Sequence, residues 1–177
     1  RAEVTDVANA IFQKADCIML SGETTKGEYP VECVSIMHVI AKNIQKKLGF
    51  DAGYLKTKDV KEAVTFGACI NAEYLDAKAI IALTESGFTP RMISRFKPSQ
   101  PIIVMTPNRR TLAKVTLSFG VLPVAIRGFR YVGEVMSIVS AFVKKRGIAK
   151  HGDKVVIAAG VPFGRSGATN MLLVHVI

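Results

Sequence analysis

The chain has 177 residues, of which 49% are hydrophobic and 21% charged. This composition supports a packed core and excludes wholesale disorder. No run approaches the roughly 20 apolar residues of a membrane-spanning helix, so no membrane partner is expected. The net charge of +10 favours an anionic partner, either nucleic acid or a phosphorylated metabolite. The basic residues are mostly dispersed, and their densest runs, at 42–47, 109–110 and 144–146, lie in or beside predicted helices. Without interleaved aromatic side chains, this pattern argues against nucleic acid.

The cysteines and histidines predict no metal or disulfide framework. Cys17, Cys33 and Cys69 all lie in apolar surroundings and are too far apart for a CxxC pair. We expect buried, reduced thiols and a cytoplasmic location. The three histidines lack metal-ligand spacing, so a structural role is expected for each.

The N-terminal third is expected to form a helix, a strand and a second helix. Val4 to Phe12 reads as a helix, and Ala15 to Leu20 is an apolar run of strand length. Pro30 opens an amphipathic helix that runs to about Lys47, because proline suits the first helical turn. Since Arg1 already stands in a helical pattern, we expect a fragment of a longer chain.

The segment 50–58 is expected to be a linker, and strands and helices alternate beyond it. Strands are expected at 79–83, 101–105, 121–126, 154–158 and 171–177. Helices are expected at 59–75, 89–96, 108–119 and 131–146. Asp59 and Glu62 resemble a capping box, and Asn108 is an N-cap candidate.

Apolar strands separated by helices predict an α/β fold, with a mostly parallel sheet covered by helices on both faces. Only residues 160–170 join the last two strands, which is too short for a parallel return. The fifth strand should therefore run antiparallel at the edge, in a sheet of order 3-2-1-4-5.

Two loops carry the polar groups of a candidate ligand site. The first contains Thr84, Glu85, Ser86, Gly87, Phe88 and Thr89. Its hydroxyls and helix N-terminus could hold a phosphate, although a capped turn without a ligand explains the same residues. The second contains Gly164, Arg165, Ser166 and Gly167. It lacks the lysine and following helix of a Walker A motif, and a wide hairpin loop is the alternative explanation.

The expected strand order brings these two loops together. The chain reverses its winding between the first and fourth strands, and open α/β sheets bind ligands at that point. Both loops leave the carboxyl ends of those strands, so they should face each other, with Arg165 available to pair with a phosphate. Their combination favours an anion site over two unrelated turns.

Several segments resemble the pyruvate kinase family. They are RAEVTDVANA at 1–10, ADCIMLSGETTKGEYP at 15–30, LTESG at 83–87, RFKP at 95–98, PIIV at 101–104 and GVPFGRSGATN at 160–170. The resemblance covers essentially the whole chain. It implies that residues 1–49 are the end of a catalytic TIM barrel. In that barrel, Ala15 to Leu20 would be the eighth strand and Pro30 to Lys47 the helix that follows it. Residues 59–177 would be the family's C-terminal allosteric α/β domain.

The resemblance also implies a reaction, the transfer of phosphoryl from phosphoenolpyruvate to ADP to give pyruvate and ATP, with Mg²⁺ and usually K⁺. Ser21 and Lys26 would lie on the nucleotide side of the barrel mouth. The metal ligands and the substrate lysine of the family fall outside this segment, so the segment alone should be inactive. A cytoplasmic homotetramer is implied for the parent enzyme.

By the same resemblance, the two loops match the family's allosteric effector site. Glu85 places a negative charge where bisphosphate-responsive members have a neutral or basic residue, and Val135 replaces an arginine. Both changes should weaken the binding of fructose 1,6-bisphosphate. AMP or a sugar monophosphate is therefore the expected effector class.

Two other functions are weighed against this one. A stand-alone phosphometabolite-binding module would not need the sequence Ser-Gly-Glu-Thr at 21–24, which the resemblance places at the mouth of the barrel. A basic RNA-binding protein is opposed by the dispersed charge.

Overall fold

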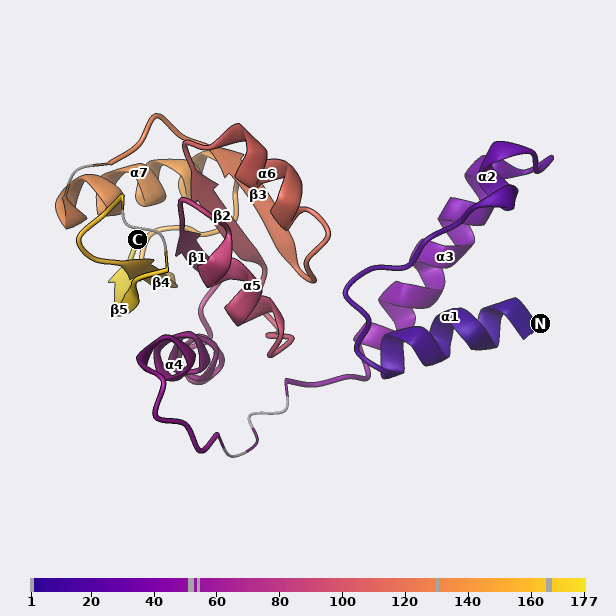
Figure 1. Ribbon diagram of the computed structural model, residues 1–177, viewed down its shortest axis with the longest axis horizontal. Coiled ribbons are helices and arrows are strands. Elements are labelled where there is room, and N and C mark those ends of the chain that lie inside the picture. The colour runs from indigo at the N-terminus through magenta and orange to yellow at the C-terminus, as the bar shows by residue number, and fades with distance from the viewer. Residues whose placement is uncertain (1, 51–52, 54, 130, 165–166) are drawn as a thin grey trace. The chain divides into compact units, whose positions relative to one another are not determined.

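The chain forms two compact units, residues 1–49 and 50–177, which are described separately (Figure 1). The computed structural model describes residues 2–50, 53, 55–129, 131–164 and 167–177. Phe50 packs against a hydrophobic core of the second unit. The beginning of the expected linker is therefore in contact with that unit.

The first unit consists of three helices, α1 (Ala2–Phe12), α2 (Gly22–Thr25) and α3 (Pro30–Gln45). Helices α1 and α3 pack against each other, and Pro30 occupies the first turn of α3 as expected. The strand expected at Ala15 to Leu20 is not formed. A strand needs a neighbouring backbone to satisfy its amides and carbonyls, and the described residues of this unit supply none.

The expected burial of all three thiols is wrong for the first unit. Cys17 is exposed and Cys33 half-buried, whereas Cys69 is buried. Cys17 lies in the segment that forms no strand, so no sheet covers it. Burial raises the pKa of the Cys69 thiol to about 12, which keeps it protonated and unreactive.

The second unit is a five-stranded sheet in the order β3-β2-β1-β4-β5, as predicted. Its strands are β1 (Ile80–Leu83), β2 (Ile102–Thr106), β3 (Val121–Ala125), β4 (Lys154–Gly160) and β5 (Thr169–Val176). Its helices are α4 (Val60–Tyr74), α5 (Phe88–Ser94), α6 (Arg109–Val115) and α7 (Val132–Lys145). All neighbouring strands are parallel except β4 and β5, which are antiparallel.

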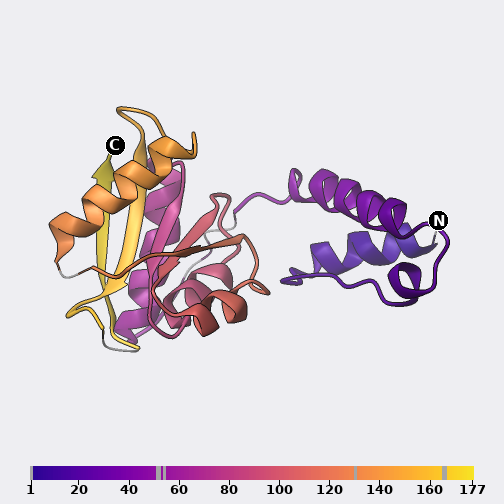
Figure 2. The same cartoon turned by 90° about the horizontal axis from the view of Figure 1, so that it is seen from above.

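Helices cover both faces of this sheet because successive strand residues point to opposite sides. Ile81, Ile103 and Ile157 form one core with α7, which contributes the fully buried Val139. Their neighbours in sequence form the other core, beneath α4, α5 and α6. Figure 2 shows α7 on one side of the sheet and α4 on the other.

The two helix caps differ in how closely they follow the sequence prediction. The Asn108 side chain accepts hydrogen bonds from the amides of Arg110 and Thr111, which confirms it as an N-cap. Asp59 caps α4 through the Lys61 amide, but Glu62 does not complete a capping box. Its carboxylate instead accepts from Thr57 and pairs with Arg95. Those two contacts lower the pKa of Glu62.

Replacing Ile103 with alanine should lower the free energy of unfolding by about 2–5 kcal/mol, because the side chain is fully buried and leaves a cavity. Leu117→Ala is the control, since Leu117 is 68% exposed and its loss should cost less than about 0.5 kcal/mol. Urea unfolding followed by circular dichroism measures both. Equal effects would contradict the assigned core.

Candidate functional site

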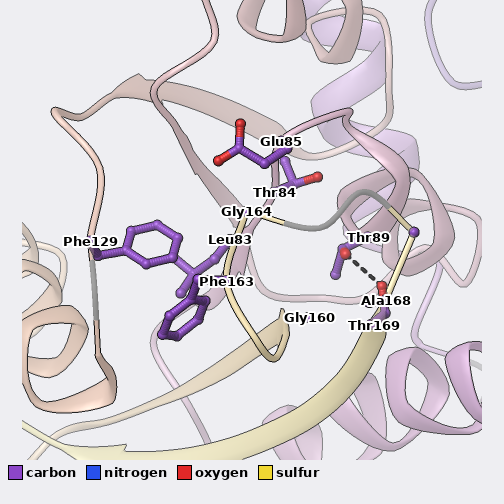
Figure 3. Close-up of a pocket in the computed structure, with 11 residues that line it drawn as sticks. Leu83, Thr84, Glu85, Thr89, Phe129, Gly160, Phe163, Gly164, Ala168 and Thr169 are labelled. Atoms are coloured by element: carbon purple, nitrogen blue, oxygen red, sulfur yellow. Dashed lines mark hydrogen bonds between the residues drawn. The ribbon is translucent and has the colours of Figure 1, made fainter.

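The loops that follow β1 and β4 line one small cavity in the second unit (Figure 3). The cavity has a volume of about 20 Å³, enough for about one water molecule. It is lined by Leu83, Thr84, Glu85, Thr89, Phe129, Gly160, Phe163, Gly164, Gly167, Ala168 and Thr169. Residues about 80 positions apart in the sequence therefore meet, as the strand order predicts.

The first loop is held by contacts that do not depend on the charged side chain of Glu85. The Gly87 amide donates to Thr84 Oγ1 at 2.9 Å, and Thr111 Oγ1 donates to the Glu85 carbonyl at 2.6 Å. Gly87 has φ +82°, and a Cβ there would approach Val115 to 2.8 Å. Glycine is thus required by the backbone at position 87, while Glu85 is one of the residues that line the cavity.

The second loop is closed at its base by a side-chain amide. Asn170 accepts from the Val161 amide and donates to the Val161 carbonyl, both at 2.7 Å. A Cβ on Gly160 would lie 2.4 Å from the Ala168 carbonyl oxygen, so only glycine allows the two sides to approach this closely. The loop therefore has a fixed entrance and exit.

A pair of threonine hydroxyls joins the two loops. Thr89 Oγ1 and Thr169 Oγ1 are 2.7 Å apart, and the two residues are 4% and 1% exposed. A buried hydroxyl is costly without a partner, so each residue satisfies the other. This contact ties the start of α5 to the start of β5.

Aromatic side chains form the other wall of the site, and sequence reasoning missed them. The rings of Phe129 and Phe163 are 4.5 Å apart in an edge-to-face arrangement. In Figure 3, Glu85 and Phe129 lie on one side of the cavity and the threonine pair on the other. An adjoining hollow of about 370 Å³ shares Glu85, Phe129, Phe163 and Gly164 with the cavity. The site can thus extend beyond the small cavity.

The predicted effector residues fall into three groups. Those that line the cavity are Thr84, Glu85, Thr89, Gly164 and Gly167. Those that do not are Ser86, Gly87 and Phe88. Phe88 instead lies beneath Lys61, whose Nζ is 5.4 Å from the ring centre. Arg165 and Ser166 lie outside the described residues.

Val135 is a buried residue of α7 that packs in the core, and it does not line the cavity. Nor does α5 add much of a dipole, since it has only seven residues. The cavity is therefore lined by threonine side chains and an aromatic wall, with one carboxylate residue, Glu85.

In the first unit, Ser21 and Lys26 flank the single turn of α2. The Ser21 amide donates to the Glu23 carboxylate at 2.9 Å, and backbone amides lower the pKa of Glu23. The Thr25 hydroxyl donates to the Ser21 carbonyl at 3.0 Å. Ser21 and Lys26 are both exposed, so their side chains are accessible to a ligand.

Neither a metal cluster nor a membrane helix is found in the part of the chain that the structure describes. No three or more His, Cys, Asp or Glu side chains gather there closely enough to hold a metal ion. No helix there is long and apolar enough to cross a bilayer.

Comparison with known proteins gives matches to both units. The family model described as "Pyruvate kinase, alpha/beta domain" matches residues 62–175, and that described as "Pyruvate kinase, barrel domain" matches residues 1–34. Pyruvate kinases of Clostridium acetobutylicum and Geobacillus stearothermophilus are 38% and 40% identical over the whole chain. The chain spans 38% and 31% of their lengths.

Solved structures give the same result. Two crystal structures of Cryptosporidium parvum pyruvate kinase match 99% of this chain and 36% of their own, with TM-scores of 0.86 and 0.89. Their identities to this chain are 29% and 30%. The chain therefore belongs to the pyruvate kinase family.

Proposed function

We propose that this chain is the C-terminal part of an enzyme that transfers phosphoryl from phosphoenolpyruvate to ADP, giving pyruvate and ATP. Its relatives are pyruvate kinases, and the barrel-domain match over residues 1–34 favours this function over a stand-alone binding module. Mg²⁺ and K⁺ would be held by residues outside this segment. Phosphoryl transfer depends on positioning and charge neutralisation, so the segment alone should be inactive.

The proposed role of the segment itself is to bind a phosphorylated effector between the loops after β1 and β4. The observation that carries this proposal is the buried contact between Thr89 and Thr169, which joins both loops around one cavity. The cavity lies beyond the carboxyl ends of β1 and β4, where the sheet reverses its winding. Threonine hydroxyls in the lining there suit a small anion.

The lining favours a ligand with one phosphate over one with two. Glu85 lines both the cavity and the adjoining hollow, so its carboxylate would repel a second phosphate. The hollow also presents the ring of Phe129, against which an apolar or planar group could pack. AMP or a sugar monophosphate fits this combination better than fructose 1,6-bisphosphate.

The remaining assignments belong to the parent enzyme. Residues 1–49 would complete its barrel, residues 50–58 would link the domains, and residues 59–177 would be the allosteric domain. Ser21 and Lys26 would face the nucleotide. A cytoplasmic homotetramer is proposed, and the exposed Val174 and Val176 on edge strand β5 are suited to a contact between subunits.

Calorimetric titration of the chain with AMP, ribose 5-phosphate, glucose 6-phosphate and fructose 1,6-bisphosphate should show binding of at least one monophosphate. The bisphosphate should bind more weakly, because Glu85 repels its second phosphate. The absence of heat with all four at millimolar concentration and low salt would refute the effector site.

Replacing Glu85 with glutamine should strengthen monophosphate binding by about fivefold, since two unit charges about 4 Å apart in water repel by about 1 kcal/mol. The loop should keep its shape, because Thr111 bonds to the backbone of Glu85. Glu32→Gln on α3 removes the same charge in the other unit and should leave the dissociation constant unchanged. A loss of affinity in Glu85→Gln would mean that the carboxylate binds the ligand.

Replacing Arg165 with alanine should weaken phosphate binding by ~1–3 kcal/mol if the guanidinium pairs directly with the phosphate. This expectation comes from the sequence, since Arg165 lies outside the described residues. Arg165→Lys should recover part of the affinity. Unchanged titration curves for both variants would exclude a direct contact.

The junction of the two loops can be tested by a double-mutant cycle. Thr89→Val and Thr169→Val should each cost about 1–3 kcal/mol of unfolding free energy, because each leaves one buried hydroxyl unpaired. The double variant should cost less than the sum by more than about 0.5 kcal/mol. The control cycle pairs Thr89→Val with Thr116→Val, whose exposed hydroxyl bonds only to its own helix. Additivity in the first cycle would contradict the contact.

A further inference from the structure

The turn between α7 and β4 carries a concentration of positive charge that the proposed effector site does not use. Residues 144–154 contain one acid, Asp153, and five cations, which are Lys144, Lys145, Arg146, Lys150 and Lys154. The first four of these cations are exposed. This turn precedes β4, whereas the effector cavity follows it, so the two lie at opposite ends of that strand.

These lysines are not neutralised within the described part of the chain. Lys144, Lys145, Lys150 and Lys154 form no ion pair with any described residue. The carboxylate of Asp153 accepts a hydrogen bond from the backbone amide of Lys150 at 2.8 Å. That acid is therefore partly satisfied by backbone and offsets only one of the five charges.

Cations near a helix C-terminus are ordinarily explained by the helix dipole, but here the final carbonyls already have partners. The Val143 carbonyl accepts from the Ile148 amide at 2.9 Å, and the Lys144 carbonyl accepts from the Gly147 amide at 3.0 Å. The lysine side chains are not needed to cap α7. Lys150 and Lys154 lie beyond the helix altogether.

The turn also encloses an open hollow of about 460 Å³. Its lining residues are Lys144, Gly147, Ile148, Ala149, Lys150, His151 and Asp153. This volume falls within the range of about 300–1,000 Å³ that is typical of small-molecule sites. Lys144 and Lys150 thus line, together with His151 and Asp153, a space large enough for a small-molecule ligand.

The frame of this hollow is fixed by backbone contacts with the end of β5. The Gly152 amide donates to the Ile177 carbonyl, and the Ile177 amide donates to the Asp153 carbonyl, both at 2.8 Å. Burial, and to a lesser extent the charge of Lys144, lower the pKa of His175 on β5. A preorganised hollow loses little entropy when it binds.

We propose that this hollow is a second anion site and that its ligand is a small molecule carrying a short oligophosphate chain. Two lysines that line the hollow, with Lys145, Arg146 and Lys154 close to them in the sequence, match several adjacent negative charges better than a single phosphate does. Single-stranded nucleic acid is a poorer fit, because such sites combine a positive groove with aromatic stacking surfaces. The hollow has no aromatic lining residue other than the imidazole of His151.

The test titrates the 177-residue chain with inorganic tripolyphosphate and, separately, orthophosphate at low salt. We expect saturable binding of tripolyphosphate with one ligand per chain and weaker binding of orthophosphate. The variant Lys144→Gln/Lys150→Gln should lose affinity about twofold to thirtyfold, the amount expected for two exposed charge contacts. Amide chemical shifts in residues 147–153 should move on binding.

The control variant, Lys46→Gln/Lys114→Gln, removes two charges from exposed positions, the C-cap of α3 and a residue of α6, and should bind as the parent does. An equal loss of affinity in the control would mean that binding depends only on net charge, and it would contradict the proposed site. So would the absence of tripolyphosphate binding, or shifts confined to residues 84–89. Tighter binding of a hexauridylate than of tripolyphosphate would replace the small-molecule ligand with RNA. None of these results except shifts at residues 84–89 bears on effector binding at the cavity.

Discussion

The parallel pairing of β4 with β1 is the constraint on which the rest of the second unit depends. Ile80, Ile81 and Ala82 lie beside Val156, Ile157 and Ala158, while β2 occupies the other side of β1. The chain therefore reverses its winding between these strands, and the loops that leave their carboxyl ends are forced together. The buried threonine pair is stable only because this pairing brings the two hydroxyls into contact. If β4 added to β3 instead, both hydroxyls would need other partners.

The sheet could be predicted from the sequence because its signals are local. Every residue of β1 and β2 is buried, and such strands read as continuous apolar runs. The predicted elements that did not form depend on contacts that the local sequence pattern does not specify. Ala15 to Leu20 has the composition of a strand, but no neighbouring strand is found among the described residues of its unit. Glu62 has capping-box spacing, yet Arg95 and Thr57 compete for its carboxylate.

The candidate site was predictable in its polar part and not in its aromatic part. Thr84, Thr89 and Gly164 follow from the loop positions at the carboxyl ends of β1 and β4. Phe129 comes from the connection before α7, which has no periodic pattern that would indicate its direction. It reaches the site because its ring packs edge-on against Phe163. Gly87 illustrates the opposite case, since its positive φ and its contact with Val115 explain it without a ligand.

The positions of the charged residues say more about where this chain could bind an anion than its net charge does. The net charge of +10 suggests an anionic partner, yet none of the described residues that line the proposed effector cavity is a lysine or arginine. Five cations lie instead between residues 144 and 154, at the other end of β4. Binding at the cavity would rest on hydroxyls and amides, with Arg165 as the one expected cation. Salt should therefore weaken an anion at the exposed basic turn far more than one held by neutral groups in the cavity, because screening acts on exposed charges.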